Sequence, residues 1–94
     1  MRLRQVEAFL AVVNGLHYGK AARQLYVSTS TVSRLVNQLE RELGAPLLDR
    51  TRGEVRLTPL GQELIEPAGR VLAAVAAFDS AACAAVAASA PRCE

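Results

Sequence analysis

One short stretch of the sequence carries polar side chains at helical spacing, with no carboxylate among them. Its members are Thr29, Ser30, Ser33, Arg34 and Asn37. Hydroxyl, amide and guanidinium groups donate hydrogen bonds, and Arg and Asn can each pair with the edge of a base. Because a helical face without acids can enter the groove of a polyanion, these residues favour nucleic-acid recognition. On composition alone, an ordinary solvated helix face explains them equally well.

Groups suited to catalysis or metal binding are sparse. His17 is the only histidine, and no serine, cysteine or carboxylate constellation accompanies it, so we expect a surface or capping role. Cys83 and Cys93 lack the spacing and the histidine partners of a metal site. We expect them to be reduced, with a disulfide as the alternative. The sequence therefore predicts no enzyme, no cofactor and no metal.

Two helices joined by a tight turn must position the polar face. The first is expected over residues 20–25 with Gly19 as its N-cap, and the turn falls at residues 26–27. Ser28 is expected to cap the second helix, and Gly44 suits a left-handed residue at its end. The second helix has apolar residues at the helical offsets 0, 3, 4, 7 and 11. These are Val32, Leu35, Val36, Leu39 and Leu43.

Another helix precedes this pair. Residues 4–14 carry an apolar stripe at helical spacing, so they predict a core helix. Gly15 is expected to end it, and Leu3 and Leu16 are expected to seal its two ends.

A β-hairpin is expected after the pair, over residues 47–50 and 55–57. Gly53, in the turn between them, is free to take positive φ. Because an isolated hairpin is marginal in water, its apolar residues must lie on the helices. These are Leu47, Val55 and Leu57. The hairpin also carries Arg50, Arg52 and Arg56, and such arginines suit phosphates or a narrow minor groove.

Thr58 and Pro59 are typical of the start of a final helix, as N-cap and first helical residue. Its apolar stripe continues for about six turns, beyond any core that 58 residues offer, so we expect a partner helix. The dimer contacts are expected at Leu64, Val71, Leu72, Val75 and Phe78. The alternative is a helix that packs only on its own domain.

Length and charge allow one small domain with a basic half. The 94 residues have a net charge of +2. Residues 1–58 hold nine basic and five acidic side chains, a net +4, whereas residues 59–94 hold two and four, a net −2.

Residues 71–91 are mostly alanine around Asp79, which argues against a membrane span. The chain enters a helix at once, so we expect no signal peptide and a cytoplasmic protein.

The pattern A-A-x-x-L-x-V-S-x-x-x-x-S-R-x-x-x-x-L-E-x-x-L-G resembles the N-terminal domain of LysR-type transcriptional regulators. It is present as Ala21-Ala22, Leu25, Val27-Ser28, Ser33-Arg34, Leu39-Glu40 and Leu43-Gly44, and the resemblance covers about residues 3–72. It implies a mainly α fold: a winged helix-turn-helix (three helices plus a β-hairpin wing) over residues 1–58. A long linker or dimerisation helix would follow over 59–88, with a frayed tail over 89–94.

The resemblance also implies sequence-specific binding of double-stranded DNA by a bacterial homodimer on a pseudo-palindromic operator, in the cytoplasm at the nucleoid. The candidates for base readout are Thr31, Ser33, Arg34 and Asn37. The candidates for DNA backbone or minor-groove contacts are Ser28, Thr29, Ser30, Arg50, Arg52 and Arg56. Many members have Arg at the place of Gly53, so Arg52 becomes the minor-groove candidate here. They also often have Gln-Pro in place of Thr29-Ser30, so the base preference cannot be carried over.

The alternative function is an interaction module that heterodimerises with a full-length regulator through the long helix, without binding DNA. Family members normally continue into a larger effector-binding domain, which these 94 residues lack. An excised DNA-binding domain and a naturally truncated regulator both fit.

Overall fold

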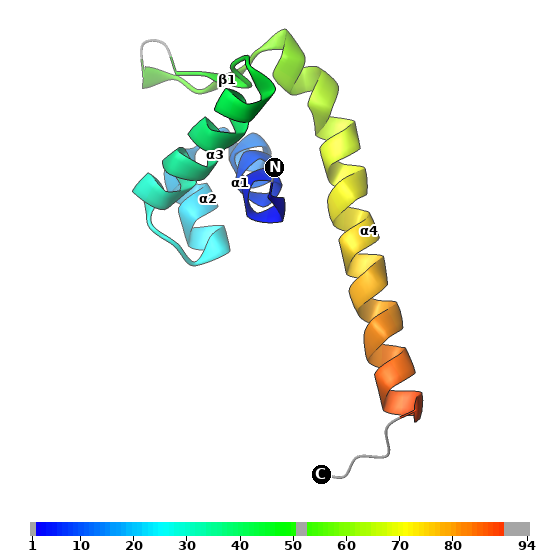
Figure 1. Ribbon diagram of the computed structural model, residues 1–94. Coiled ribbons are helices and arrows are strands. Elements are labelled where there is room, and N and C mark those ends of the chain that lie inside the picture. Colours follow the sequence, from blue (N-terminus) through cyan, green and yellow to red (C-terminus); the bar gives the residue numbers. More distant parts are fainter. Residues whose placement is uncertain (1, 51–52, 90–94) are drawn as a thin grey trace.

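The computed structural model describes residues 2–50 and 53–89. Three helices are followed by a two-stranded hairpin and a long fourth helix (Figure 1). The elements are α1 Leu3–Gly15, α2 Tyr18–Leu25, α3 Thr29–Leu43, β1 Leu48–Asp49, β2 Arg56–Leu57 and α4 Pro59–Ser89. The predicted fold class, a mainly α winged helix-turn-helix with a long final helix, is confirmed.

The hydrophobic core lies where α1, α2 and α3 pack on one another. Its largest fully buried side chains are Phe9, Val12, Val32, Val36 and Leu47. Ala21 and Ala22 of α2 are also buried, and their small size lets this short helix lie close to its neighbours. The helix-turn-helix is therefore held on α1 as one packed unit.

The start of α2 differs from the prediction. The helix begins at Tyr18, and its N-cap is His17, whose Nδ1 accepts a hydrogen bond of 3.0 Å from the backbone N–H of Lys20. Gly19, expected to be the cap, lies inside the first turn. A Cβ at Gly19 would come within 2.8 Å of the His17 ring, so this glycine makes room for the imidazole. The expected capping role of His17 is confirmed, and that of Gly19 is wrong.

Helix α1 ends at Gly15, as predicted, but the roles expected of Leu3 and Leu16 differ. Gly15 is its last helical residue, and the chain reverses at Leu16, which has φ 50° and donates its N–H to the carbonyl of Val12. Leu3 and Leu16 are both exposed, because the buried part of α1 extends only from Gln5 to Val12. The expectation that they seal the helix ends is wrong.

Both ends of α3 are confirmed. The Ser28 hydroxyl accepts a hydrogen bond of 3.1 Å from the N–H of Thr31, and Gly44 adopts φ 81° at the other end. Between α2 and α3, Tyr26 has φ 60° and an exposed fraction of 94%. The N–H of Val27 donates to the carbonyl of Ala22, which closes the turn.

The hairpin is short, antiparallel and fixed to α3. Leu48 pairs with Leu57 and Asp49 with Arg56. Of the three residues expected to lie on the helices, Leu47 is buried and Val55 and Leu57 are half-buried against the core, as predicted. Gly53 has the expected positive φ, 75°.

Glu40, near the end of α3, connects that helix to the hairpin. One oxygen of its carboxylate, Oε2, accepts hydrogen bonds from the N–H groups of Leu47 at 2.8 Å and Leu48 at 3.0 Å. Bonds to a charged acceptor are among the stronger ones in proteins. The position of the wing is therefore set by a residue of α3.

The start of α4 is locked to the hairpin. The Thr58 hydroxyl accepts from the N–H of Gly61 at 3.0 Å and donates to the carbonyl of Pro46 at 2.8 Å, so its predicted capping role is confirmed. Gly61 is buried, and a Cβ there would collide with the carbonyl of Leu47. Glycine lets the first turn of α4 touch the hairpin backbone.

The rest of α4 leaves the domain (Figure 1). Its first turns pack on the core, whereas Val71, Phe78 and Val86 are exposed. The second half of α4 therefore does not pack on residues 1–58, and a partner helix stays a prediction. By length and composition, Pro59–Ala88 also meets the requirement for a membrane span, with a mean hydropathy of 2.0. The same composition suits a helix that pairs with another helix.

Candidate nucleic-acid interface

The outer face of α3 forms a shallow hollow. Its lining is Ser30, Ser33, Arg34, Asn37, Gln38 and Arg41. Arg34, Asn37 and Arg41 are exposed. None of these lining residues is acidic, and the nearby Glu40 carboxylate is held by the hairpin backbone. The hollow therefore offers hydrogen-bond donors and positive charge to whatever enters it.

The hydroxyl groups at the start of α3 form a cluster. Ser28 Oγ lies 3.1 Å from Ser30 Oγ and 2.8 Å from Thr31 Oγ1, within hydrogen-bond distance of both. Thr29 is exposed beside them. The half-buried Thr31 thus belongs to the N-terminal cap rather than to the hollow. Residues 28–31 form a polar collar at the positive end of the helix.

Arg50, at the base of the wing, already has two partners in the domain. Its guanidinium carbon lies 4.8 Å from the centre of the Tyr18 ring, which is the geometry of a cation–π contact. Its Nη1 also donates a long hydrogen bond of 3.4 Å to Ser33 Oγ. Burial raises the pKa of Tyr18, and the Arg50 charge opposes that rise. Arg50 therefore connects the wing to α2 and to the hollow.

The other wing arginines differ from Arg50. Arg56 donates from Nε and Nη2 to Glu54 Oε1, at 3.1 and 2.8 Å, and both side chains are largely exposed. An exposed pair of this kind contributes little free energy, so Arg56 can exchange Glu54 for a phosphate at low cost. Arg52 lies outside the described residues.

The residues that could bind a metal ion are spread over the described part of the chain. Within residues 2–50 and 53–89, no three His, Cys, Asp or Glu side chains gather as a metal site requires.

Comparison with known families identifies the family to which this fold belongs. The family described as "Bacterial regulatory helix-turn-helix protein, lysR family" matches residues 3–62, nearly two thirds of the chain. This chain belongs to the LysR family.

Relatives of this LysR-family chain are regulators. This chain is 41% identical over 80 residues to the HTH-type transcriptional regulator IlvR of Caulobacter vibrioides. The matched region covers 85% of this chain and 26% of IlvR. The chain thus spans about a quarter of that curated relative's length. Transcriptional regulators of this kind are not enzymes.

Solved structures of other proteins have a similar backbone over most of this chain. Full-length OxyR C199D from Pseudomonas aeruginosa matches with a TM-score of 0.86 and 33% identity, over 89% of this chain and 28% of that one. The BenM_DBD/catB site 1 DNA complex matches with a TM-score of 0.83 and 34% identity, over 96% of this chain and 99% of that one. Since residues 1–58 are under two thirds of the chain, these matches include much of α4.

The structure adds residues to the predicted LysR-family site. Gln38 and Arg41 lie four and seven positions after Arg34, so the helical period could have placed them on the same face. Tyr18 could not have been found in this way, because its contact with Arg50 depends on how the hairpin sits. The predicted Ser30, Ser33, Arg34 and Asn37 lie together, whereas Arg56 lies away from their hollow.

Proposed function

We propose that this chain binds double-stranded DNA sequence-specifically, as the DNA-binding part of a LysR-type transcriptional regulator. The observation that carries the proposal is the acid-free hollow on α3, fixed in a helix-turn-helix and joined to the wing by Arg50. An exposed helix of this kind fits the major groove. The similarity to the BenM DNA complex supports the same role for α3.

Base readout is assigned to the hollow. Arg34 is exposed and can donate two hydrogen bonds to O6 and N7 of guanine, and Asn37 can pair with adenine. Ser33 lines the same hollow and accepts a hydrogen bond from Arg50, and Arg41 extends the same face. Thr31 supports the cap, so its contribution to readout comes through the position of the first turn.

Backbone contacts are assigned to the two ends of the interface. Ser28, Thr29 and Ser30 present hydroxyls at the N-terminus of α3, where the helix dipole favours a phosphate. Arg50 and Arg56 present guanidiniums from the wing, and Arg52 is proposed to join them. These contacts fix the register on the duplex and carry no sequence information themselves.

A homodimer is proposed to form through α4. Val71 is 42% and Phe78 73% exposed, and Leu64, Leu72 and Val75 lie half-buried along the same helix. Burying a large apolar side chain is worth about 1.5–3 kcal/mol, so this face favours a partner. A two-fold dimer presents two copies of α3 to a pseudo-palindromic operator, with half-sites about one helical turn apart or a multiple of it.

We propose that each segment of the fold has its own function. Residues 1–58 form the DNA-binding domain, 59–88 the dimerisation helix and 89–94 a tail. We propose that a protein with these two parts acts on DNA in the cytoplasm, at the nucleoid.

Selection of bound duplexes from a random pool tests the proposal. We expect enrichment of a two-fold-related motif, with an affinity that falls as salt rises by about 0.9 log units per log unit for each phosphate contact. A random duplex should bind more weakly with a similar dependence on salt. A chain that retains no duplex at low salt, yet pairs with a full-length regulator, would instead be the interaction module.

A further inference from the structure

Gln5 of α1 is the one buried polar side chain among residues 2–50 and 53–89. It is 3% exposed, and both ends of its amide have partners. Oε1 accepts a hydrogen bond of 3.2 Å from the backbone N–H of Arg2, and Nε2 donates one of 3.3 Å to Oε1 of Gln38 on α3. Because a buried polar group costs free energy unless it is paired, these two bonds hold the Gln5 amide in one orientation.

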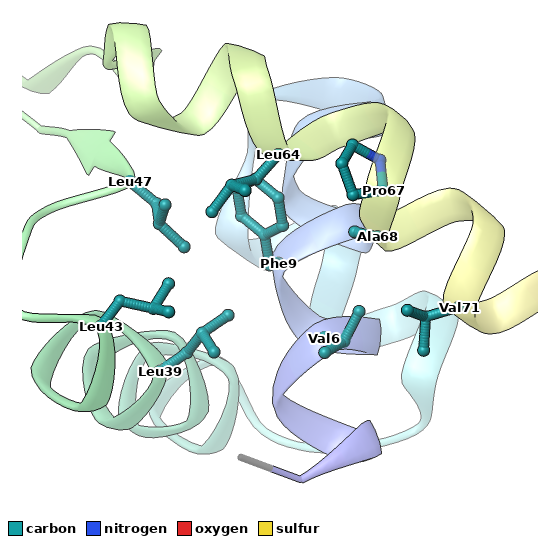
Figure 2. Close-up of a pocket in the computed structure, with 9 residues that line it drawn as sticks. All are labelled: Val6, Phe9, Leu39, Leu43, Leu47, Leu64, Pro67, Ala68 and Val71. Atoms are coloured by element: carbon teal, nitrogen blue, oxygen red, sulfur yellow. The ribbon is translucent and has the colours of Figure 1, made fainter.

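Apolar contacts fix the two helices that carry these glutamines. Val6, next to Gln5, and Leu39, next to Gln38, both line the apolar groove between α1, α3 and α4 (Figure 2). Val6 and Leu39 are buried, and α1 and α3 also pack directly on each other. The apolar core therefore sets the position of Gln5 relative to Gln38.

The direction of the Gln5 amide decides the direction of the Gln38 amide. A backbone N–H can only donate, so the atom of Gln5 that faces Arg2 must be the oxygen. The other end of the Gln5 amide is then the NH2 group, which can only donate, so the atom of Gln38 that it meets must also be an oxygen. The NH2 group of Gln38 is therefore the end left for the hollow, which Gln38 lines.

Ser33 is oriented in the same sense from the wing. Arg50 Nη1 donates to Ser33 Oγ at 3.4 Å, which uses that oxygen as an acceptor and leaves the hydroxyl proton to donate elsewhere. Arg34 and Arg41, which line the same hollow, can only donate. With Gln38, four of the six lining side chains thus present donors.

We propose that Gln5 is a positioning residue for base readout: by holding the Gln38 oxygen, it makes Gln38 read a base through hydrogen-bond donors alone. The proposal rests on the proposed DNA binding and deepens it. In the major groove, guanine offers the acceptors O6 and N7 and thymine offers O4, whereas cytosine offers the N4 donor. The base that faces Gln38 is therefore guanine or thymine in preference to cytosine.

Adenine sharpens the difference between a held and a free glutamine. A free glutamine pairs with adenine by using both ends of its amide, as acceptor from N6 and donor to N7. In this chain the Gln38 oxygen is turned toward Gln5, so only the donor end can reach the base. Gln5 therefore removes the contact by which glutamine most often recognises adenine.

Selection of bound duplexes from a random pool, with the full chain, tests the proposal. Gln38→Ala identifies the base position under Gln38, because the preference there should relax. Gln5→Met keeps the length of the side chain and removes both hydrogen bonds, so it should relax the same position and leave the others unchanged. We expect discrimination against cytosine at that position to fall about 3- to 10-fold in both variants, the size of one net hydrogen bond. Gln62→Met makes the same change at an exposed site on α4 and should select the wild-type motif.

Combining the two variants separates positioning from packing. In the Gln38→Ala background, Gln5→Met should cause no further loss of discrimination, since it acts only through Gln38. Additive losses of discrimination would contradict this. If Gln5→Met weakens binding to every duplex equally and leaves the base preference intact, Gln5 is a structural residue and the proposal is overturned.

Gln38→Glu reverses the chemistry of the contact. One carboxylate oxygen can accept from Gln5 while the other faces the hollow, and a carboxylate pairs with the N4 group of cytosine. We expect lower affinity for every duplex, because the new charge repels phosphate, together with a switch to cytosine at the same position. This variant also decides the matter if circular dichroism shows that Gln5→Met does not fold, since the absence of a switch overturns the proposal.

The outcomes for the wild type separate this inference from the proposed function. A selected motif with cytosine facing Gln38 overturns the donor-only contact and leaves sequence-specific binding in place. A wild type that selects no duplex overturns the proposed function, and the inference with it.

Discussion

The two phenylalanines of this chain lie in opposite surroundings. Phe9 of α1 is 1% exposed in the core, whereas Phe78 of α4 is 73% exposed on a helix that has left the domain. Both belong to apolar stripes at helical spacing. The difference shows that the described part of residues 1–58 buries most of its large apolar side chains, whereas the second half of α4 leaves Phe78 and Val86 exposed.

The polar groups show the same contrast. In the domain, caps and turns are closed by Ser28, His17, Glu40 and Thr58, each through a hydrogen bond to the backbone. Along the second half of α4, the stripe of Val71, Val75 and Phe78 offers only apolar side chains. The domain therefore closes its own caps and turns and exposes a polar face that suits DNA. The second half of α4 exposes an apolar face, which suits contact with a protein.

Phe9→Ala should have the largest effect on the domain. Removing this buried ring leaves a cavity and should cost about 3–5 kcal/mol of the free energy of unfolding. Urea denaturation, followed by circular dichroism at one fixed protein concentration, measures it. Phe78→Ala, studied at a concentration where the wild type is monomeric, should leave the transition unchanged. Equal losses from the two variants would contradict the contrast between the two halves.

Gly61→Ala should come next, at the junction of the halves. The new Cβ meets the Leu47 carbonyl, so we expect a loss of about 1–3 kcal/mol in the free energy of unfolding. Gly69→Ala is the matched control, because nothing lies within 4 Å of a Cβ there. That variant should gain about 0.5–1 kcal/mol from helix propensity. Stabilisation by both substitutions would show that α4 is not locked to the hairpin.

Arg34→Ala tests the polar face of the domain. Losing one paired base contact should remove about 1–3 kcal/mol of discrimination between the selected and a random duplex. Fluorescence anisotropy on both duplexes measures the difference. Arg70→Ala, which removes an exposed cation of α4, should leave the discrimination unchanged. If Arg34→Ala weakens both duplexes equally, Arg34 contacts phosphate.

Tyr18→Leu should have the smallest effect. It removes the ring under Arg50 and should cost about 0.5–1 kcal/mol of affinity for every duplex, because the guanidinium is less well held. Tyr18→Phe keeps the ring and should bind like the wild type. Combined with Arg50→Ala, Tyr18→Leu should add little further loss. Fully additive losses would mean that the two residues act independently.

The parts that could be predicted from the sequence have strong local signals. Ser28, Gly44 and Thr58 are the residue types that cap helices, and the structure confirms each. The apolar offsets of α3 placed Arg34 and Asn37 on the exposed face. Here the local preference and the fold agree.

The misses occurred where packing overrides local preference. A leucine with positive φ is uncommon, so nothing in the sequence distinguishes Leu16 as the residue where the chain turns after α1. His17 replaced Gly19 as the cap because the ring fits over a residue without a side chain. The contacts of Arg50 required the orientation of the hairpin, which the Glu40 carboxylate fixes from a distance of several residues.

The free half of α4 has a consequence for the order of assembly. Contacts within residues 1–58 are mostly between neighbouring elements, so the domain should fold in about microseconds to milliseconds. The proposed pairing of α4 requires two chains to meet, so its rate would depend on protein concentration. Refolding after dilution from denaturant should thus show a fast phase that ignores concentration and a slower one that follows it. In a cell, newly made chains would fold first and pair later, and the amount synthesised would set how many can span both half-sites.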